Sequence, residues 1–303
     1  MENKSILVVG SVALDTVKTP FGEAKEVLGG SATFFSFAAS FFANVNLVGV
    51  VGEDFPPSCI ELLRSRNIDL RGLEIKKGKT FRWSGVYKDD LNERDTLSLE
   101  LNVFEDFHPL LPPGLRQCPY VFLANIDPEL HLEVIEQIKH QCLIVCDTMN
   151  IWIENKRQAL EKTLRLIDIL FLNDSEARQL TREANLIKAG KEILKLGPKS
   201  VIIKKGEHGV MYFSPDSFFT IPAYPLESVC DPTGAGDSFA GGFLGYLAKE
   251  GGDEKKIRLA LVYATIIASF TVEDFSLERL KHVTDKEIEK RFQEFKDMTN
   301  FEV

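Results

Sequence analysis

The sequence predicts an α/β fold in which a parallel sheet is covered by helices and carries a small antiparallel β lid. From residue 119 onward, short β-branched runs alternate with longer segments suited to helices, an order that implies parallel strands with covering helices. Residues 80–101 differ, because their apolar and polar side chains alternate with period two around a polar turn. That pattern is typical of antiparallel strands with one face in water.

The length of the chain suits a single domain. It has 303 residues, enough for one large α/β domain or two smaller ones, and no linker, repeat or low-complexity segment divides it. We therefore expect one domain over residues 1–303, with a lid subdomain from about 12–28 and 80–103. Five cysteines without a paired CxxC spacing indicate reduced thiols and no zinc site.

Charge and hydropathy limit the partners that the chain is expected to have. The formal net charge of -9 argues against a general nucleic-acid or anionic-membrane partner. No apolar run reaches the roughly 20 residues that cross a bilayer, and the first residues show no signal peptide. We expect a cytoplasmic protein whose main partner is a small molecule.

In the N-terminal part, each element follows from a local pattern. Buried strands are expected at 5–11 and 46–52, where β-branched runs contain or end in glycine. A buried helix is expected at 34–43, because its phenylalanines occupy nearly every side. A further helix is expected at 58–66, after a proline-containing turn.

In the C-terminal part, the alternation of strand and helix patterns sets the elements. Strands are expected at residues 120–123, 143–146, 167–172, 199–204, 209–213 and 217–221. Helices are expected at residues 128–140, 154–165, 175–181, 253–270 and 284–295. The parallel strands of such a fold bring their C-terminal ends to one edge of the sheet, where ligands bind.

A glycine-rich loop at residues 231–239 (D-P-T-G-A-G-D-S-F) enters an apolar segment that is predicted to be a buried helix. The first amides of a helix have no intrahelical partner, and the helix dipole adds partial positive charge. Gly234 and Gly236 let the backbone approach a ligand closely, so the loop favours an anion such as a phosphoryl group. Asp237 then places a carboxylate beside that anion, as phosphoryl transfer to an alcohol requires. The alternative is a turn in which Asp237 only caps the helix.

The same string closely resembles the C-terminal signature of the ribokinase (PfkB) family of sugar and nucleoside kinases. The resemblance implies a ribokinase-like three-layer α/β/α sandwich. It also implies an ATP- and Mg²⁺-dependent kinase that phosphorylates a hydroxymethyl group of a small sugar. It assigns Asp237 as the catalytic base, and the backbone of Gly234, Ala235, Gly236 and Asp237 as the anion hole.

The acceptor side is expected near the N-terminus. Asp15 lies just beyond the first strand, where ligands bind in open α/β sheets, although a surface turn also explains an acid there. By resemblance, Asp15 contacts sugar hydroxyls, and Gly29 and Gly30 with the following Ser31 match the family's N-terminal substrate signature. Phe34 stands where many members carry Asn, which leaves the identity of the bound sugar open.

Two further motifs are expected to hold the nucleotide and the metal. Asn173 and Glu176 form N-x-x-E after a predicted strand; the residues alone suit a helix cap, and the resemblance assigns them to Mg²⁺, through water, and to phosphate oxygens. Lys204, Gly206 and Gly209 match a segment that touches the nucleotide phosphates in the family, and a basic turn in water is the alternative.

Two more acids are weaker candidates. Asp147 ends a predicted strand and either caps the next element or lines the cleft. Asp231 matches a position that contributes to a monovalent-cation site in some relatives, with K⁺ as the candidate ion. His208 is expected to be a solvated turn residue, and the histidines form no metal cluster in the sequence.

Several alternatives stay open at this point. A nucleoside kinase of the same fold is one, because Phe34, Phe81, Trp83 and Tyr87 suit stacking on a base as well as core and lid packing. A non-catalytic protein that binds nucleotide or sugar is another. A nucleotide-dependent oxidoreductase is indicated only by the opening strand, and the missing G-x-G-x-x-G argues against it. The resemblance also leaves open a homodimer formed through the lid.

Overall fold

The computed structural model describes residues 4–88, 90–251 and 254–300, which form a nine-stranded sheet and a four-stranded sheet. In spatial order, the large sheet consists of β13 (Phe218–Ile221), β12 (Val210–Phe213), β11 (Ser200–Lys204), β10 (Ile169–Asn173), β9 (Leu143–Asp147), β8 (Tyr120–Leu123), β1 (Ile6–Val9), β4 (Val45–Gly52) and β5 (Asp69–Lys76). The strands from β11 to β5 run parallel, and β12 and β13 add an antiparallel edge.

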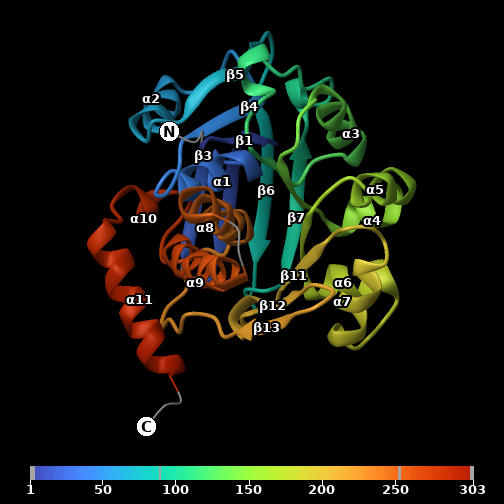
Figure 1. The fold of residues 1–303 in the computed structure, drawn as a ribbon. Helices are drawn as coiled ribbons and strands as arrows, with labels where there is room; N and C mark the ends of the chain where they lie inside the picture. Colours follow the sequence, from blue (N-terminus) through green and yellow to red (C-terminus); the bar gives the residue numbers. More distant parts are fainter. Residues whose placement is uncertain (1–3, 89, 252–253, 301–303) are drawn as a thin grey trace.

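Helices cover both faces of the large sheet (Figure 1). One face carries α1 (Ser31–Ala39), α8 (Ala235–Glu250) and α9 (Glu254–Thr271). The other carries α3 (Pro128–Gln137), α4 (Asn150–Asn155), α5 (Arg157–Leu164), α6 (Asp174–Thr181) and α7 (Leu186–Leu194). The remaining helices are α2 (Pro57–Ser65), α10 (Glu278–Lys281) and α11 (Asp285–Thr299), with 3-10 turns at Asn102–Phe104, Pro113–Leu115 and Gly206–His208.

The burial of β1 shows why the fold has three layers. All four of its residues are 0% exposed, and alternate side chains enter opposite faces of the sheet. Ile6 and Val8 pack in the cluster formed with α1, α8 and α9, whereas Leu7 and Val9 pack in the cluster formed with α3, α5, α6 and α7. The predicted three-layer α/β/α sandwich is confirmed.

Helix α8 is buried along most of its length, and its small residues let it approach α1 closely. A Cβ at Gly241 would lie 2.4 Å from the carbonyl oxygen of Phe35, so this position has no room for a side chain. The close packing fixes the direction of α8 and therefore the place where its N-terminus meets the sheet. Among the residues that the structure describes, no helix is both long and apolar enough to span a membrane.

Some predicted boundaries were wrong for local reasons. The helix predicted over 154–165 is two helices, because Lys156 leaves the helical region at φ -128° and ψ 31°. The helix predicted over 34–43 begins earlier, at Ser31, because Gly30 with φ 94° already serves as its N-cap. It also ends earlier, at Ala39.

Other elements were not predicted at all. Strand β5 is partly exposed and mixes polar with apolar residues, so it shows neither a continuous apolar run nor a clean alternation. Helices α7 and α10 were also missed. The predicted helix start at Asp253 and the predicted turn residue Asp89 lie outside the described residues.

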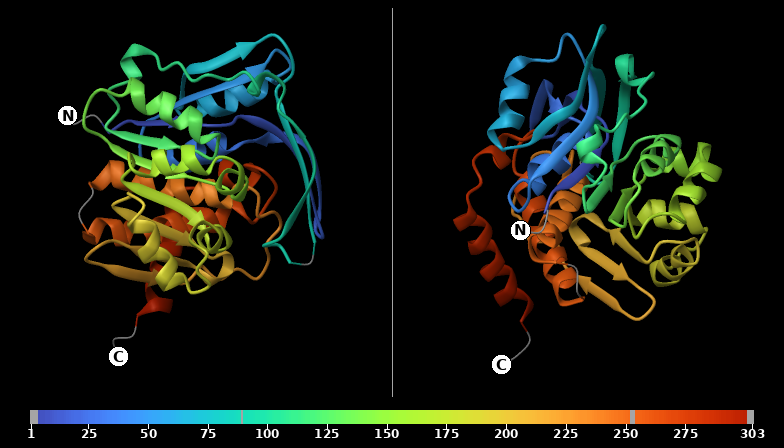
Figure 2. Two further views of the ribbon diagram at one scale, coloured as in Figure 1. Left: turned by 90° about the vertical axis from the view of Figure 1, so that its right-hand side faces the viewer. Right: turned by 45° about the horizontal axis from the view of Figure 1, so that its top comes forward.

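The smaller sheet forms the lid, and its strand order is β3 (Gly22–Gly29), β2 (Ala13–Thr19), β6 (Phe81–Tyr87) and β7 (Arg94–Glu100). It extends along one side of the body (Figure 2, left). The pairs β2–β3 and β6–β7 are antiparallel as expected, but β2 and β6 run parallel. The expected all-antiparallel lid was wrong at this pair, because both strands leave the body and enter the lid in the same direction.

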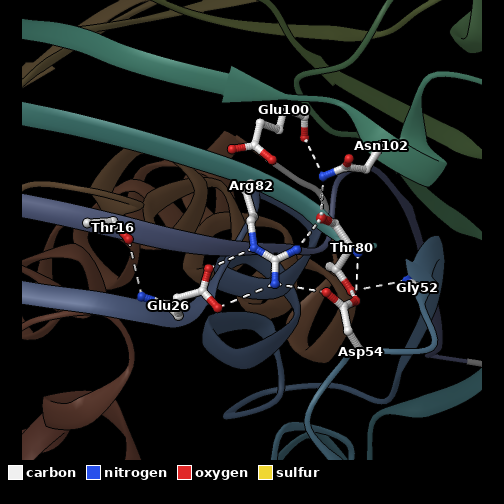
Figure 3. A network of polar contacts seen from close by, with 8 residues as sticks. All are labelled: Thr16, Glu26, Gly52, Asp54, Thr80, Arg82, Glu100 and Asn102. Atoms are coloured by element: carbon white, nitrogen blue, oxygen red, sulfur yellow. Dashed lines mark hydrogen bonds and ion pairs between the residues drawn. The ribbon is translucent and has the colours of Figure 1, made fainter. Parts of the chain in front are cut away.

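A polar network ties the base of the lid to the body (Figure 3). Thr80 precedes β6 and is 0% exposed; its hydroxyl accepts from the Gly52 amide at 3.0 Å and donates to Asp54 at 2.8 Å. Arg82 then bridges Asp54 at 2.8 Å and Glu26, on β3, at 2.7 Å. The network joins two lid strands to the loop after β4, so the base of the lid is held in place.

Replacing Thr80 with valine tests this junction. Thr80→Val removes the partner of a buried amide and of a carboxylate while it keeps a branched side chain, so the free energy of unfolding should fall by about 1–3 kcal/mol. Urea denaturation measures the change. The matched control is Thr96→Val on the exposed strand β7, which should change the free energy by less than about 0.5 kcal/mol. Equal midpoints for the two variants would show that the junction does not stabilise the fold.

Candidate active site

The glycine-rich loop ends in the first turn of α8, as predicted. Gly234 is the N-cap of the helix and takes the left-handed conformation, with φ 76° and ψ 0°. A Cβ at this position would also lie 2.3 Å from Cγ of Phe34, so backbone conformation and packing both require glycine. The amides of Gly236 and Asp237 lie in the first helical turn, where a helix offers them no carbonyl partner. The Ala235 amide, in the same turn, donates to the Pro232 carbonyl at 3.2 Å.

Three strand ends meet the N-terminus of α8. Lys204 is the last residue of β11, and a Cβ at Gly236 would lie 3.0 Å from its Nζ. The same Nζ lies 2.8 Å from Oδ2 of Asp147, the last residue of β9. Between these strands, Asn173 ends β10 in register with Lys204. The ends of β9, β10 and β11 therefore bring polar side chains to the amides of α8.

Lys204 is the cation of this cluster. Burial lowers the pKa of Lys204, but the negative charges of Asp147, Glu176 and Asp237 outweigh burial and raise it overall. The ammonium group therefore stays charged and lies among three acids. A fixed charge of this kind suits the binding of a phosphate group.

Two acids of the cluster titrate near neutral pH. Burial raises the pKa of Asp237 to about 7, and the charge of Asp147 adds to the rise, while Lys204 opposes it. Burial, again with Asp147, raises the pKa of Glu176 to about 7. A carboxyl group with a pKa near 7 is suited to accept and release a proton at neutral pH.

Asp15 lies on the other side of the cleft, within the lid strand β2 rather than in a loop. Burial raises its pKa to about 7, and a hydrogen bond from the Gly30 backbone opposes this rise. A Cβ at Gly29 would lie 1.9 Å from Oδ2 of Asp15, so the glycine makes room for the carboxylate. The charge of Asp15 also raises the pKa of Asp237, so the two acids lie within electrostatic range of each other.

A cavity of about 370 Å³ opens beside Lys204, and Asp15 is not among its lining residues. Gly206, Gly209 and Gly236 line it together with Lys204. Its apolar wall includes Tyr224, Leu226, Val229, Phe239, Ala268 and Val272. The volume and the mostly apolar lining are typical of a small-molecule pocket.

The tip of the lid contacts both the glycine-rich loop and this cavity. The Thr233 hydroxyl lies 3.2 Å from the Tyr87 hydroxyl at the end of β6. In the turn that follows, Asn92 lines the cavity, and its Oδ1 would be 2.3 Å from a Cβ at Gly206. The lid therefore rests on the loop that precedes α8.

The site thus combines a glycine-rich helix N-terminus with a lysine and several acids. Residues 3–277 of the chain match the pfkB family carbohydrate kinase model. The chain belongs to the pfkB family of carbohydrate kinases. The predicted family and the prediction of a phosphotransferase with an alcohol acceptor are confirmed, and the oxidoreductase alternative is set aside.

Several relatives of this pfkB chain are named nucleoside kinases or ribokinases. The cytidine kinase of Thermococcus kodakarensis is 30% identical over 263 residues, which cover 84% of this chain and 93% of that protein. The solved nucleoside kinase of Methanocaldococcus jannaschii has a TM-score of 0.79 at 21% identity, covering 96% of this chain and 98% of that one. A candidate ribokinase II from Escherichia coli, solved with ATP and Mg²⁺, has a TM-score of 0.80 at 21% identity, with 96% of this chain and 99% of that one covered. The ribokinase-like fold is confirmed.

The N-x-x-E motif of this family member forms a capping box. The Asn173 side chain accepts from the Glu176 amide at 2.8 Å, and Oε2 of Glu176 accepts from the Asn173 amide at 2.7 Å. The cap expected from the residues alone is therefore present. In the capping box Glu176 stays 8% exposed, and its charge raises the pKa of Lys204. Glu176 can therefore cap the helix and also belong to the site around Lys204.

Several predicted site residues have structural contacts of their own. Phe34 is 2% exposed and packs beneath Gly234, so its ring belongs to the core under the loop. The Ser31 hydroxyl lies 3.0 Å from that of Ser11 and fixes the start of α1. Asp231 is 1% exposed and accepts from the Thr233 amide at 2.9 Å, which holds the glycine-rich loop. Their expected roles toward acceptor and cation stay predictions.

Sequence reasoning missed two kinds of residue at this site. The lid residues Asn92 and Arg94 reach the site, but in the sequence they look like an ordinary polar turn and strand start. Tyr87 was considered only for stacking or packing, and its contact with Thr233 was not predicted. The wall of the cavity at 223–229 follows β13 without a regular pattern. Asp147, expected either as a cap or in the cleft, is the ion partner of Lys204.

The raised pKa of Asp237 predicts a gain of stability when its charge is removed. The pKa is about 7 in the folded protein against about 4 in an unfolded chain, so folding takes up a proton between these values and stability falls as pH rises toward 7. Asp237→Asn should therefore raise the thermal midpoint at pH 8 by about 2 °C or more. The difference in midpoint between the variant and the wild type should shrink toward pH 5.

Differential scanning calorimetry at the two pH values measures the difference. The control is Asp216→Asn, because Asp216 is exposed in the turn between β12 and β13 and should show no such difference. A midpoint for Asp237→Asn that falls at pH 8 would contradict the buried-charge explanation.

Proposed function

We propose that the protein is an ATP- and Mg²⁺-dependent kinase that phosphorylates a hydroxymethyl group of a small sugar or of the sugar of a nucleoside, with Asp237 as the general base. The observation that carries this proposal is the position of Asp237. Its carboxyl group lies in the first turn of α8, interacts electrostatically with Lys204, and faces the same cleft as Asp15. The position of Asp237 thus supports three roles together: a general base, a site for an anion and a carboxylate that binds the acceptor.

The nucleotide is proposed to occupy the cavity beside Lys204. The apolar wall around Tyr224 and Val272 suits a base, and the lysine at its inner end suits the phosphates. This orientation directs the terminal phosphate toward the N-terminus of α8. There, the amides of Gly236 and Asp237 donate to the oxygens of the transferring phosphoryl group, and the Ala235 amide joins them by giving up its bond to the Pro232 carbonyl.

In the transfer itself, the acceptor oxygen forms a bond to the γ-phosphorus as the bond to the ADP oxygen breaks. Asp237 takes the proton of the acceptor hydroxyl, so the attacking oxygen does not build up positive charge. Lys204 and the α8 amides stabilise the negative charge that develops on the phosphoryl oxygens. Asp15 accepts hydrogen bonds from neighbouring hydroxyls of the acceptor and orients it.

Glu176 and Asn173 are the proposed holders of Mg²⁺. The capping box uses Oε2 of Glu176, and the second carboxylate oxygen suits a hydrated cation that is otherwise bound by phosphate. Among the described residues, no group of three His, Cys, Asp or Glu side chains is placed to hold a metal by itself, which fits an ion bound mainly through water and phosphate. When bound, Mg²⁺ neutralises charge on the phosphates. A monovalent cation, K⁺, near Asp231 is proposed on the resemblance alone.

The acceptor is either a small sugar or a nucleoside, and two observations favour the nucleoside. Trp83 lies opposite Asp15 in the pairing of β2 with β6, so both side chains share the face of the lid that meets the cleft. An aromatic ring there suits stacking on a base. The relative from T. kodakarensis is named a cytidine kinase. Pairing of two subunits through the lid is a separate proposal.

The test is ADP formation from MgATP with cytidine, inosine or ribose as acceptor. Asp237→Asn should lower turnover by roughly 10²–10⁴-fold and leave ATP binding nearly intact, because a positioned base contributes about that much. The exposed Asp216→Asn variant should keep wild-type turnover.

Near-normal turnover of Asp237→Asn would remove this residue from the role of base. If wild-type protein binds MgATP but forms no ADP with any of the acceptors, the alternative of a non-catalytic binding protein gains support instead.

A further inference from the structure

The cleft contains more acidic side chains than the cations of the large α/β body can neutralise. Asp15, Asp147, Glu176 and Asp237 all contribute negative charge, and Lys204 is already paired with Asp147 at 2.8 Å. A nucleotide would add further negative charge at the same place. Phosphoryl transfer in such surroundings needs another positive group near the reacting atoms.

Arg94 brings such a charge from the lid. It is the first residue of β7 and pairs in register with Tyr87, the last residue of β6. Since the Tyr87 hydroxyl lies 3.2 Å from that of Thr233, this end of the hairpin rests on the glycine-rich loop. The register therefore places the backbone of Arg94 beside the loop that precedes α8.

The side chain of Arg94 extends toward the middle of the cleft. Its Nη2 lies 4.0 Å from Sδ of Met149, two residues after Asp147, and its guanidinium carbon lies 5.6 Å from the centre of the Trp83 ring. These two contacts mark opposite sides of the cleft, because Trp83 is opposite Asp15 and Met149 is close to the Lys204–Asp147 pair.

The electrostatic reach of Arg94 agrees with this position. Burial raises the pKa values of Asp15, Glu176 and Asp237, and the positive charge of Arg94 opposes the rise in all three. Arg94 is exposed, yet its charge acts on acids of β2, α6 and α8 at the same time. The guanidinium group thus lies near the point between acceptor and nucleotide.

We propose that Arg94 binds the γ-phosphoryl group of the nucleotide as it is transferred, so that the lid completes the anion site that the α8 amides and Lys204 begin. This inference rests on the proposed kinase function. A guanidinium group keeps its charge at all working pH values and donates two parallel hydrogen bonds to phosphate oxygens. Because Arg94 belongs to the lid, the site is complete only when the lid is seated on Thr233. Transfer to water is then disfavoured until the acceptor is covered.

The test compares Arg94→Met with Lys88→Met. Lys88 lies in the same hairpin, but it is exposed and forms an ion pair with Asp95, so its loss changes the lid charge equally without affecting the cleft. Arg94 is also exposed, so neither variant should disturb folding. With a turned-over acceptor, Arg94→Met should lower kcat by roughly 10²-fold, and Lys88→Met should leave it within about twofold. Arg94→Lys should recover part of the loss.

A binding measurement tests the contact without turnover. Titration calorimetry with Mg²⁺ and either AMPPNP or ADP gives the contribution of the γ-phosphate. Arg94→Met should weaken AMPPNP binding about tenfold or more relative to wild type and leave ADP binding nearly unchanged. Equal weakening of both nucleotides, or a change only in the Michaelis constant of the acceptor with kcat intact, would overturn the proposal.

The two proposals fail in different ways. If wild-type protein forms no ADP with any acceptor, the kinase function fails, and the comparison of AMPPNP with ADP still decides whether Arg94 contacts the γ-phosphate. If wild-type protein turns over and Arg94→Met keeps its kcat, only the role of Arg94 is overturned.

Discussion

The ion pair between Lys204 and Asp147 is the interaction on which the rest of the site depends. It holds a charged ammonium group at the ends of β9 and β11, against the N-terminus of α8. Glu176 is buried and Asp237 is half-buried beside it, and the lysine limits the rise of their pKa values to about 7. Loss of one partner of such a pair leaves the other charge uncompensated, which is strongly destabilising in a buried setting. The pair thus keeps acids ionisable where an anion must also bind.

The lid adds a second constraint, because it is fixed at its base and rests on the site at its tip. Thr80, Asp54 and Arg82 hold the base to the loop after β4. At the far end, Tyr87 contacts Thr233 of the glycine-rich loop. The acceptor carboxylate Asp15 is itself a lid residue, so movement of the lid changes the acceptor side and the phosphate side of the cleft together.

The sequence predicted those features that depend on local chemistry. Loop 231–239 could be recognised because an exposed amide turn needs glycine, as the φ of Gly234 shows. The large sheet could be recognised because its buried strands are continuously apolar. The Lys204–Asp147 pair and Arg94 could not be assigned, since their roles arise only when distant strands and the lid meet. The parallel pairing of β2 with β6 was missed for the same reason, because period two does not show the direction of a partner strand.

Asp237 is proposed to accept a proton during transfer, and the pH dependence of kcat/KM tests this role. A base with a pKa of about 7 must lose its proton to act, so kcat/KM should rise with pH below about 7 and level off above it. The residual activity of the Asn variant should lack this rise. A wild-type profile that stays flat from acid to alkaline pH, or a variant that keeps both the rise and the rate, would contradict the claim.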